Sequence, residues 1–197
     1  MKEIVAATNN PDKLREIREI LGTQYSILSL KDEGISIEIE ENGSNFYENA
    51  LIKAKTVTKL TGKPSLADDS GLIVHALGGA PGIYSARYGG EDCDSLLNRA
   101  KLLMEMKGIE ERDASFYSSV VLFFPDSTIL SADGEAKGMI LHEERGTKGF
   151  GYDSLFFSYA LNKSFAEASA EEKNFVSHRG VALKQLLIKL STINKEI

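Results

Sequence analysis

Two adjacent carboxylates, Asp68 and Asp69, lie within the segment LADDSGL (66–72), between an apolar run and a glycine. This pattern predicts that a strand breaks here and presents both acids into a cleft. A second acidic segment, ISIEIEENG (35–43), contains Glu41. Hard divalent cations such as Mg²⁺ bind a few carboxylates and share their other positions with water and phosphate oxygens. The two segments together predict such a site, whereas the simpler interpretation is a turn capped by one aspartate.

A possible phosphate-binding turn precedes them at TNNPDK (8–13), where an apolar strand ends and a helix begins. The backbone N–H groups and the positive end of the helix dipole at such a turn suit a phosphate, and Lys13 adds a cation. The simpler interpretation makes Asn10 an ordinary N-cap, Pro11 the first helical residue and Lys13 a solvated surface charge.

Two C-terminal segments could bind a nucleotide base. GTKGFGYDSLFF (146–157) places glycines around Phe150, whose ring could stack on a base. EEKNFVSHRG (171–180) groups Lys173, His178 and Arg179, which could bind phosphate or a carbonyl oxygen. The alternative for the second segment is a surface helix capped by Ser177.

Several common motifs are missing from the sequence. It contains neither G-x-G-x-x-G nor G-x-x-x-x-G-K-[ST], so it carries no dinucleotide fingerprint and no P-loop. G-x-S-x-G and H-E-x-x-H are also missing. The three histidines are scattered, which argues against a His-rich metal site.

The elements that must position these residues follow from hydrophobic periodicity. Strands are expected at 3–8, 25–30, 114–125 and 127–141, and two short apolar runs flank the acids within 64–79. Helices are expected from the NNPDK turn to Gly22, from Ser44 to about Thr61, over 94–108, and from Ser177 to the C-terminal region. The pattern predicts a mixed α/β fold.

Composition limits the class of protein. The 197 residues are 42% hydrophobic and 26% charged, enough for one well-cored domain. The net charge of −6 argues against nucleic acid as a partner. The single cysteine, Cys93, excludes an internal disulfide, and no apolar stretch approaches the ~20 residues of a membrane span. We therefore expect a cytoplasmic protein that binds no membrane.

Five blocks of the sequence resemble the inosine triphosphate pyrophosphatase family, in the family's order and over nearly the whole chain. They are ATNNPDKLREI, FYENALIKA, LADDSGLIVHALGGAPGIYSARY, GFGYDSLFF and EEKNFVSHRGVAL. The resemblance implies one domain over 1–197, with an elongated central mixed sheet, flanking helices and two lobes around a cleft. It also implies a homodimer that hydrolyses ITP, dITP and XTP to the monophosphate and pyrophosphate, with Mg²⁺. Two departures from the family pattern, His75 and Ser154, fall outside the implied site.

The resemblance also implies a role for individual residues. Asp69 is expected to be the general base and to hold Mg²⁺ together with Glu41. The triphosphate is expected to contact Thr8, Asn9, Asn10, Pro11, Asp12, Lys13 and Lys53, with Ser70 near the substrate. Base and phosphate contacts are expected from Phe150, Gly151, Tyr152, Asp153, Lys173, His178 and Arg179.

Two alternatives stay open at this point. One is a related nucleotide pyrophosphatase with another base preference, including modified pyrimidines. The other is a nucleotide sensor that binds ITP without releasing pyrophosphate.

Overall fold

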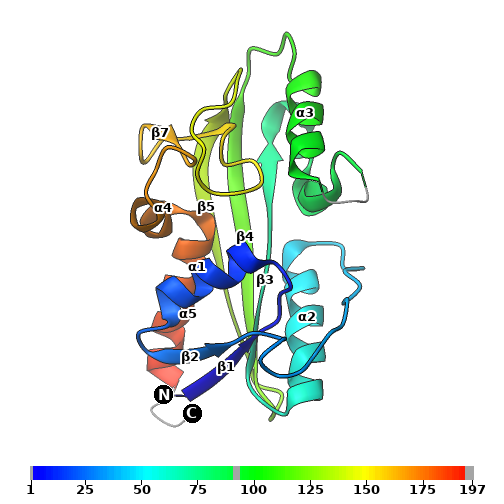
Figure 1. Cartoon of the computed structure of the whole chain (residues 1–197), viewed down its shortest axis with the longest axis vertical. Helices are drawn as coiled ribbons and strands as arrows, with labels where there is room; N and C mark the ends of the chain where they lie inside the picture. Colours follow the sequence, from blue (N-terminus) through cyan, green and yellow to red (C-terminus); the bar gives the residue numbers. More distant parts are fainter. Residues whose placement is uncertain (1, 91–93, 194–197) are drawn as a thin grey trace. The chain divides into compact units, whose positions relative to one another are not determined.

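The computed structural model describes residues 2–90 and 94–193, so Cys93 lies outside the described residues. The protein has an α/β fold with a seven-stranded sheet of order β2-β1-β3-β4-β5-β6-β7. Figure 1 shows the helices and strands along the chain. The strands are β1 (Lys2–Ala6), β2 (Tyr25–Leu28), β3 (Ser65–Val74), β4 (Asp113–Phe123), β5 (Ile129–Ile140), β6 (Phe156–Ser158) and β7 (Lys163–Ser164). The helices are α1 (Pro11–Leu21), α2 (Phe46–Thr61), α3 (Ser95–Glu105), α4 (Ala170–Val176) and α5 (His178–Ile193), with short 3₁₀ helices at His75–Leu77 and Gly82–Arg87.

The sheet is mixed, as the sequence predicted. Strand β1 runs parallel to both β2 and β3, whereas β6 runs antiparallel to β5 and β7. None of the helices in the described ranges is long and apolar enough to span a bilayer.

Two compact units can be distinguished from the contacts between Cα atoms. Unit 1 comprises 1–69, 118–134 and 179–197, and unit 2 comprises 70–117 and 135–178. The expectation of a single domain with a cleft stays a prediction.

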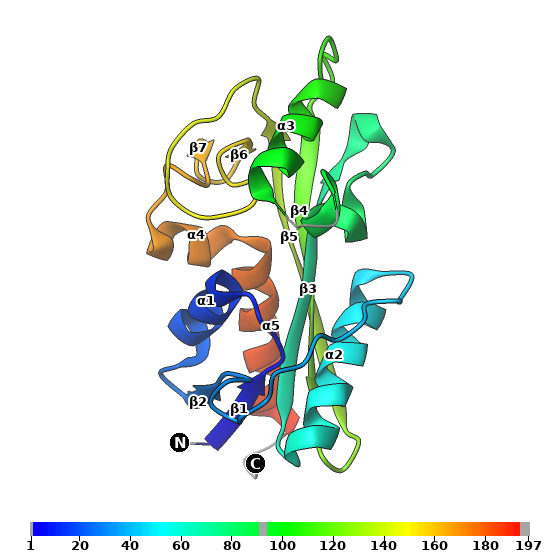
Figure 2. The same cartoon turned by 45° about the vertical axis from the view of Figure 1, so that its right-hand side comes forward.

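In unit 1, the alternation of side chains along the strands separates two cores. One core contains Ile4, Leu66 and Leu122 and packs against α1 and α5, while Val121 and Ala67 belong to the other core, with α2. Both views show α2 on one side of the strands and α1 and α5 on the other (Figure 2). Because neighbouring strand residues point to opposite faces, each face of β3 is covered by helices.

The core of unit 2 is rich in aromatic side chains. Phe116 packs edge-on against Phe156, with ring centroids 4.8 Å apart, and stacks on Phe165 at 5.9 Å. Leu102 and Met106 of α3 belong to the same buried cluster. This core supports the loop 146–155 and the helix α4.

One sequence expectation was wrong. Strand β3 does not break at the two acids but runs through them for ten residues, from Ser65 to Val74. Both aspartates are buried there, and each is compensated by cations. The polar pair therefore marks the middle of a buried strand.

Other boundaries differ less. The segment 35–43 alternates apolar and acidic residues, but it forms no strand. The N-cap of helix α2 is Asn45 rather than Ser44, and the Asn45 side chain accepts a hydrogen bond from the Glu48 N–H. Helix α4, which the sequence reading did not separate, precedes α5 and begins with a capping box formed by Ser169 and Glu172.

Candidate active site

The N-terminal turn is placed beside the acids by strand register. Ala6 of β1 pairs with Leu66 of β3 in parallel, so the residues after β1 lie next to the residues after Leu66. The Ala7 N–H continues this pairing with a bond to the Leu66 carbonyl at 2.8 Å. As a result, the loop that starts α1 reaches Asp68.

The cap of α1 follows the simpler interpretation of the sequence. The Asn10 side chain accepts from the N–H groups of Asp12 and Lys13 at 2.9 and 3.1 Å, and Pro11 is the first helical residue. The Thr8 hydroxyl oxygen accepts from the Asn10 N–H, and the side-chain amide of Asn9 donates to the Ile37 carbonyl oxygen. The turn is thus held by its own side chains, and the helix N–H groups of Asp12 and Lys13 already have a partner.

Lys13 is not a solvated surface charge, in contrast to that interpretation. Its Nζ lies 2.9 Å from Asp68 Oδ2, and its side chain is only 17% exposed. It occupies the first turn of α1, three residues before the buried Glu16. A spacing of three residues places both on one face of the helix.

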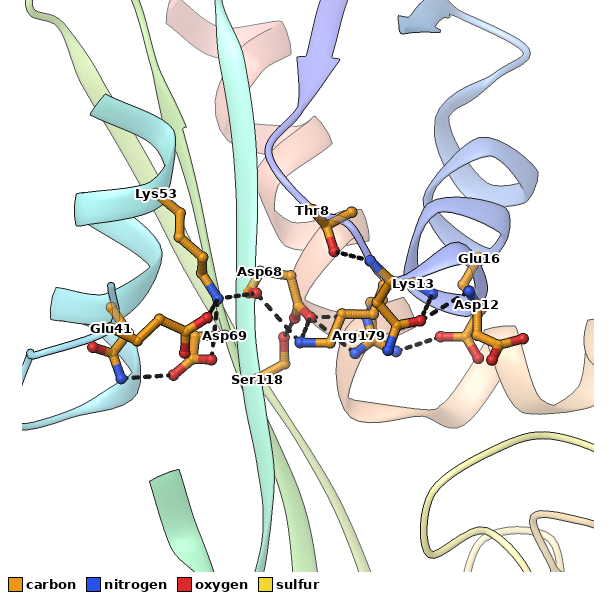
Figure 3. A network of polar contacts seen from close by, with 12 residues as sticks. Thr8, Asp12, Lys13, Glu16, Glu41, Lys53, Asp68, Asp69, Ser118 and Arg179 are labelled. Carbon is orange, nitrogen blue, oxygen red and sulfur yellow. Dashed lines mark hydrogen bonds and ion pairs between the residues drawn. The ribbon is translucent and has the colours of Figure 1, made fainter. Parts of the chain in front are cut away.

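The two aspartates point to opposite faces of β3 and have different partners (Figure 3). Asp68 shares a face with Leu66 and meets α1 and α5, where it pairs with Lys13 and Arg179. Asp69 shares a face with Ala67 and meets α2, where it pairs with Lys53 at 3.2 Å. One dipeptide thereby connects two groups of charges.

On the Asp68 side, neighbouring cations favour the charged form of the carboxylate. Burial alone would raise the pKa of Asp68, but the charges of Arg179 and Lys13 and the hydrogen bond from Ser118 outweigh burial and hold this pKa well below its usual range. Arg179 also binds Glu16, so this cation joins two buried carboxylates.

On the Asp69 side, the pKa values of Asp69 and Glu41 shift in opposite directions. Burial is the main reason that the pKa of Asp69 is raised, and the negative charges of Glu41 and Asp68 add to it. Burial also acts on Glu41, but the charge and hydrogen bond of Lys53 outweigh it, so the pKa of Glu41 is lowered. Two neighbouring carboxylates with opposite shifts are typical of an acid-base site.

Asn49, which the sequence left without a role, supports Asp69. Its side-chain Nδ2 donates to Asp69 Oδ2 at 3.2 Å, and its side-chain Oδ1 accepts from the Gly43 N–H at 2.8 Å. Glu48, in contrast, is exposed and accepts from both the N–H and the hydroxyl of Ser44. Asn49 therefore orients the carboxylate, and Glu48 fixes the loop that leads into α2.

We name the set in unit 1 the charged cluster. It comprises Lys13, Glu16, Glu41, Lys53, Asp68, Asp69 and Arg179. Four carboxylates thus face three cations. The net charge of the charged cluster is slightly negative, and a bound divalent cation would make it positive. A positive net charge suits a polyanionic ligand.

Unit 2 contains most of the residues predicted to bind the base, namely Phe150, Gly151, Tyr152, Asp153, Lys173 and His178. Ser70, which follows Asp69 in β3, also belongs to unit 2. Lys173 Nζ contacts Asp153 Oδ2 at 2.6 Å and lies 4.7 Å from the centre of the Phe150 ring. Asp153 Oδ2 also accepts a hydrogen bond from the Phe150 N–H at 2.9 Å. Asp153 therefore fixes both the loop backbone and the cation beside the ring.

Tyr152 and His178 are deeply buried, as are Asp153 and Lys173. The Tyr152 hydroxyl donates to the Ser85 carbonyl at 2.8 Å, so its ring belongs to the core of unit 2. His178 is 4% exposed and stacks on Phe116, with ring centroids 4.7 Å apart. Gly151 has a φ of +60° next to Tyr152, a conformation that favours glycine.

The sequence reading missed Glu16 and Ser118. Glu16 lies between the apolar positions of α1 and three residues from Lys13, a spacing that could have revealed it. Ser118 begins a pair of serines within the apolar strand SFYSSVVLFF and is fully buried. Small polar residues within such a strand indicate a buried partner, here Asp68.

Comparison with known proteins assigns the family. The Ham1 family model matches residues 4–189. The chain belongs to the Ham1 family. It is 47% identical to the dITP/XTP pyrophosphatase of Bacillus licheniformis, over 94% of this chain and 96% of the relative. It is 49% identical to the dITP/XTP pyrophosphatase of Geobacter sulfurreducens, over 94% and 95%.

Solved structures of Ham1 proteins agree with the fold. The Staphylococcus aureus Ham1 protein matches with a TM-score of 0.87 and 37% identity, covering 98% of this chain and all of that one. A Ham1 protein of Coxiella burnetii gives the same TM-score and coverage at 39% identity. The resemblance found in the sequence is thus confirmed for the family and for the α/β fold.

Proposed function

We propose that this chain hydrolyses the non-canonical purine triphosphates ITP, dITP and XTP to the monophosphate and pyrophosphate, which removes them from the nucleotide pool. The observation that carries the proposal is the buried Asp69 with its raised pKa, next to Lys53 and Glu41. Relatives named dITP/XTP pyrophosphatases, at 47–49% identity over nearly the whole chain, support the same activity.

The oxygens around Lys53 fit a hard divalent cation. No group of three or more His, Cys, Asp or Glu side chains within residues 2–90 and 94–193 is placed to hold a metal ion. Mg²⁺ needs fewer, because one or two carboxylates, water and substrate phosphates complete its shell. Glu41 Oε1, the Asp68 carbonyl oxygen and Asp69 Oδ1 all lie within 3.2 Å of the Lys53 ammonium. We therefore assign Mg²⁺ to Glu41 and Asp69, where it would neutralise phosphate charge and make a water more acidic.

The protein groups supply the remaining chemistry. Asp69, whose carboxylate is held by Asn49 and Lys53, takes the proton of the attacking water. The water oxygen bonds to the α phosphorus as the bond to the bridging oxygen breaks, and pyrophosphate leaves. Lys13 and Lys53 balance the phosphate charge, and Asn49 keeps Asp69 in position.

Base selectivity follows from hydrogen-bond donors in unit 2. Hypoxanthine and xanthine carry an O6 acceptor where adenine has an amino donor, so protein donors pair with the first two bases and leave an unpaired group against adenine. Arg179 already binds Asp68 and Glu16, and the Phe150 N–H binds Asp153. We assign O6 recognition to the backbone N–H groups of Gly151 and Tyr152, with the base stacked on Phe150.

The test is product analysis with ITP, XTP, ATP and GTP in the presence of Mg²⁺. We expect IMP and pyrophosphate from ITP, the corresponding products from XTP, and much slower turnover of ATP. Formation of IDP and orthophosphate would contradict the assigned bond, and equal rates for ATP and ITP would contradict the donor argument. ITP binding without any pyrophosphate would favour a sensor.

We further infer from the family resemblance that the protein is a homodimer in the cytoplasm. Light scattering after size-exclusion chromatography should give twice the mass of the chain, which is 21.6 kDa. A mass equal to one chain would contradict the dimer.

A further inference from the structure

The Lys53 ammonium lies at the point where three oxygens of the charged cluster converge (Figure 3). It contacts Glu41 Oε1 at 2.9 Å, the Asp68 carbonyl oxygen at 3.0 Å and Asp69 Oδ1 at 3.2 Å. An ammonium group has three N–H donors, and each finds one acceptor here. The lysine is therefore fully satisfied by the same oxygens that suit a divalent cation.

The charge of Lys53 is secured by these contacts. Its side chain is 9% exposed, and its ammonium forms ion pairs with both Glu41 and Asp69, at 2.9 and 3.2 Å. The carboxylates are thus neutralised by a cation that belongs to the chain. A metal ion that shares them meets a fixed like charge nearby, which opposes its binding.

We propose that Lys53 occupies the divalent-cation position in the nucleotide-free protein, so that a metal ion binds tightly only together with a triphosphate. The flexible four-carbon stem of lysine lets the ammonium leave the carboxylates for another anion. A triphosphate supplies that anion, and this step rests on the proposed function. Lys53 is then a positioning residue that makes metal binding depend on substrate.

The test is a titration of the nucleotide-free full-length protein with Mn²⁺, in which electron paramagnetic resonance measures the free ion. Lys53→Met removes the charge and keeps much of the apolar stem. We expect this variant to bind Mn²⁺ at least about tenfold more tightly than the wild type. Circular dichroism checks its fold, and Lys53→Gln replaces it if the methionine variant does not fold.

Two further variants locate the effect. Lys59→Met removes one exposed positive charge from the same helix and should leave the affinity for Mn²⁺ as in the wild type. Adding Glu41→Gln to Lys53→Met should abolish the gain, because it removes one of the two carboxylates. A gain that survives this second change, or one that Lys59→Met reproduces, would overturn the proposal.

An affinity in Lys53→Met equal to or below that of the wild type would also overturn it. This measurement involves neither nucleotide nor turnover. A negative result would therefore contradict the role of Lys53 without contradicting the pyrophosphatase assignment. That assignment is tested by product analysis with the wild type.

Discussion

Arg179 at the start of α5 links two buried carboxylates from different elements, Asp68 of β3 and Glu16 of α1. Its Nη2 and Nε donate to Asp68 Oδ2 at 2.9 and 3.2 Å, and its Nη1 binds Glu16. The side chain is 1% exposed. Because Asp68 also holds Lys13, this link connects the start of α5 with the lysine that we assign to the phosphates.

Replacing Arg179 by methionine should therefore destabilise the protein strongly. Breaking a buried ion pair costs about 3–5 kcal/mol, and here Glu16 and Asp68 each lose an ion-pair partner, although Lys13 still pairs with Asp68. Urea denaturation should show a lower midpoint at an unchanged slope.

Arg15→Met is the matched control for Arg179→Met. Arg15 lies on α1 with a side chain 53% exposed, and it pairs with Asp12 at 2.7 Å. Surface pairs of this kind contribute less than about 1 kcal/mol. Similar losses of stability in the two variants would show that the buried Arg179 ion pairs contribute no more to stability than a surface ion pair.

Gly149 and Gly151 allow a paired test of the loop that carries Phe150. Both have positive φ, +75° and +60°, so alanine at either position costs about 1–2 kcal/mol of backbone strain. Only at Gly149 would the added Cβ meet Asp153, 2.1 Å from its Oδ2, whereas the Cβ at Gly151 has open space. We expect Gly149→Ala to lower the melting temperature more than Gly151→Ala, because Asp153 must leave Lys173 and the Phe150 N–H. Equal shifts in calorimetry would contradict this role of Asp153.

Glu172 should make the stability of α4 depend on pH. Hydrogen bonds from Lys163 and the Ser169 N–H lower the pKa of Glu172 to about 2, from an ordinary value of 4.5. A carboxyl whose pKa is lower in the folded state stabilises it fully above the unfolded pKa, and this contribution is lost as the pH falls from about 4.5 through about 2. Glu172→Gln should thus melt below the wild type at pH 7, with the difference disappearing near pH 2. A carboxyl resonance that titrates near 4.5 in NMR would contradict the shift.

Much of unit 1 could be predicted from local signals. The Asn10-Pro11 cap, the Gly22 stop and the apolar spacing between them gave α1 to within a residue, because all these interactions lie within one helix. The strands expected at 114–125 and 127–141 correspond to β4 and β5. These elements depend little on distant parts of the chain.

The course of β3 could not be predicted in the same way. Asp68 and Asp69 interrupt an apolar pattern, and a local reading treats such an interruption as the end of a strand. The strand continues because Lys13, Lys53 and Arg179, distant in sequence, compensate both acids. The sequence thus pointed to both acids as candidate site residues, whereas tertiary partners decide the secondary structure of the strand that carries them.

The rate of pyrophosphate release from ITP by Asp69→Asn, with Mg²⁺ present, tests the central claim most directly. Asparagine keeps the size of the side chain but cannot accept the proton, and general bases contribute about 10²–10⁴-fold. We expect a loss of at least about 10²-fold in kcat, while Asp133→Asn, at an exposed position of β5, retains the wild-type rate. Near wild-type release by folded Asp69→Asn would contradict the account.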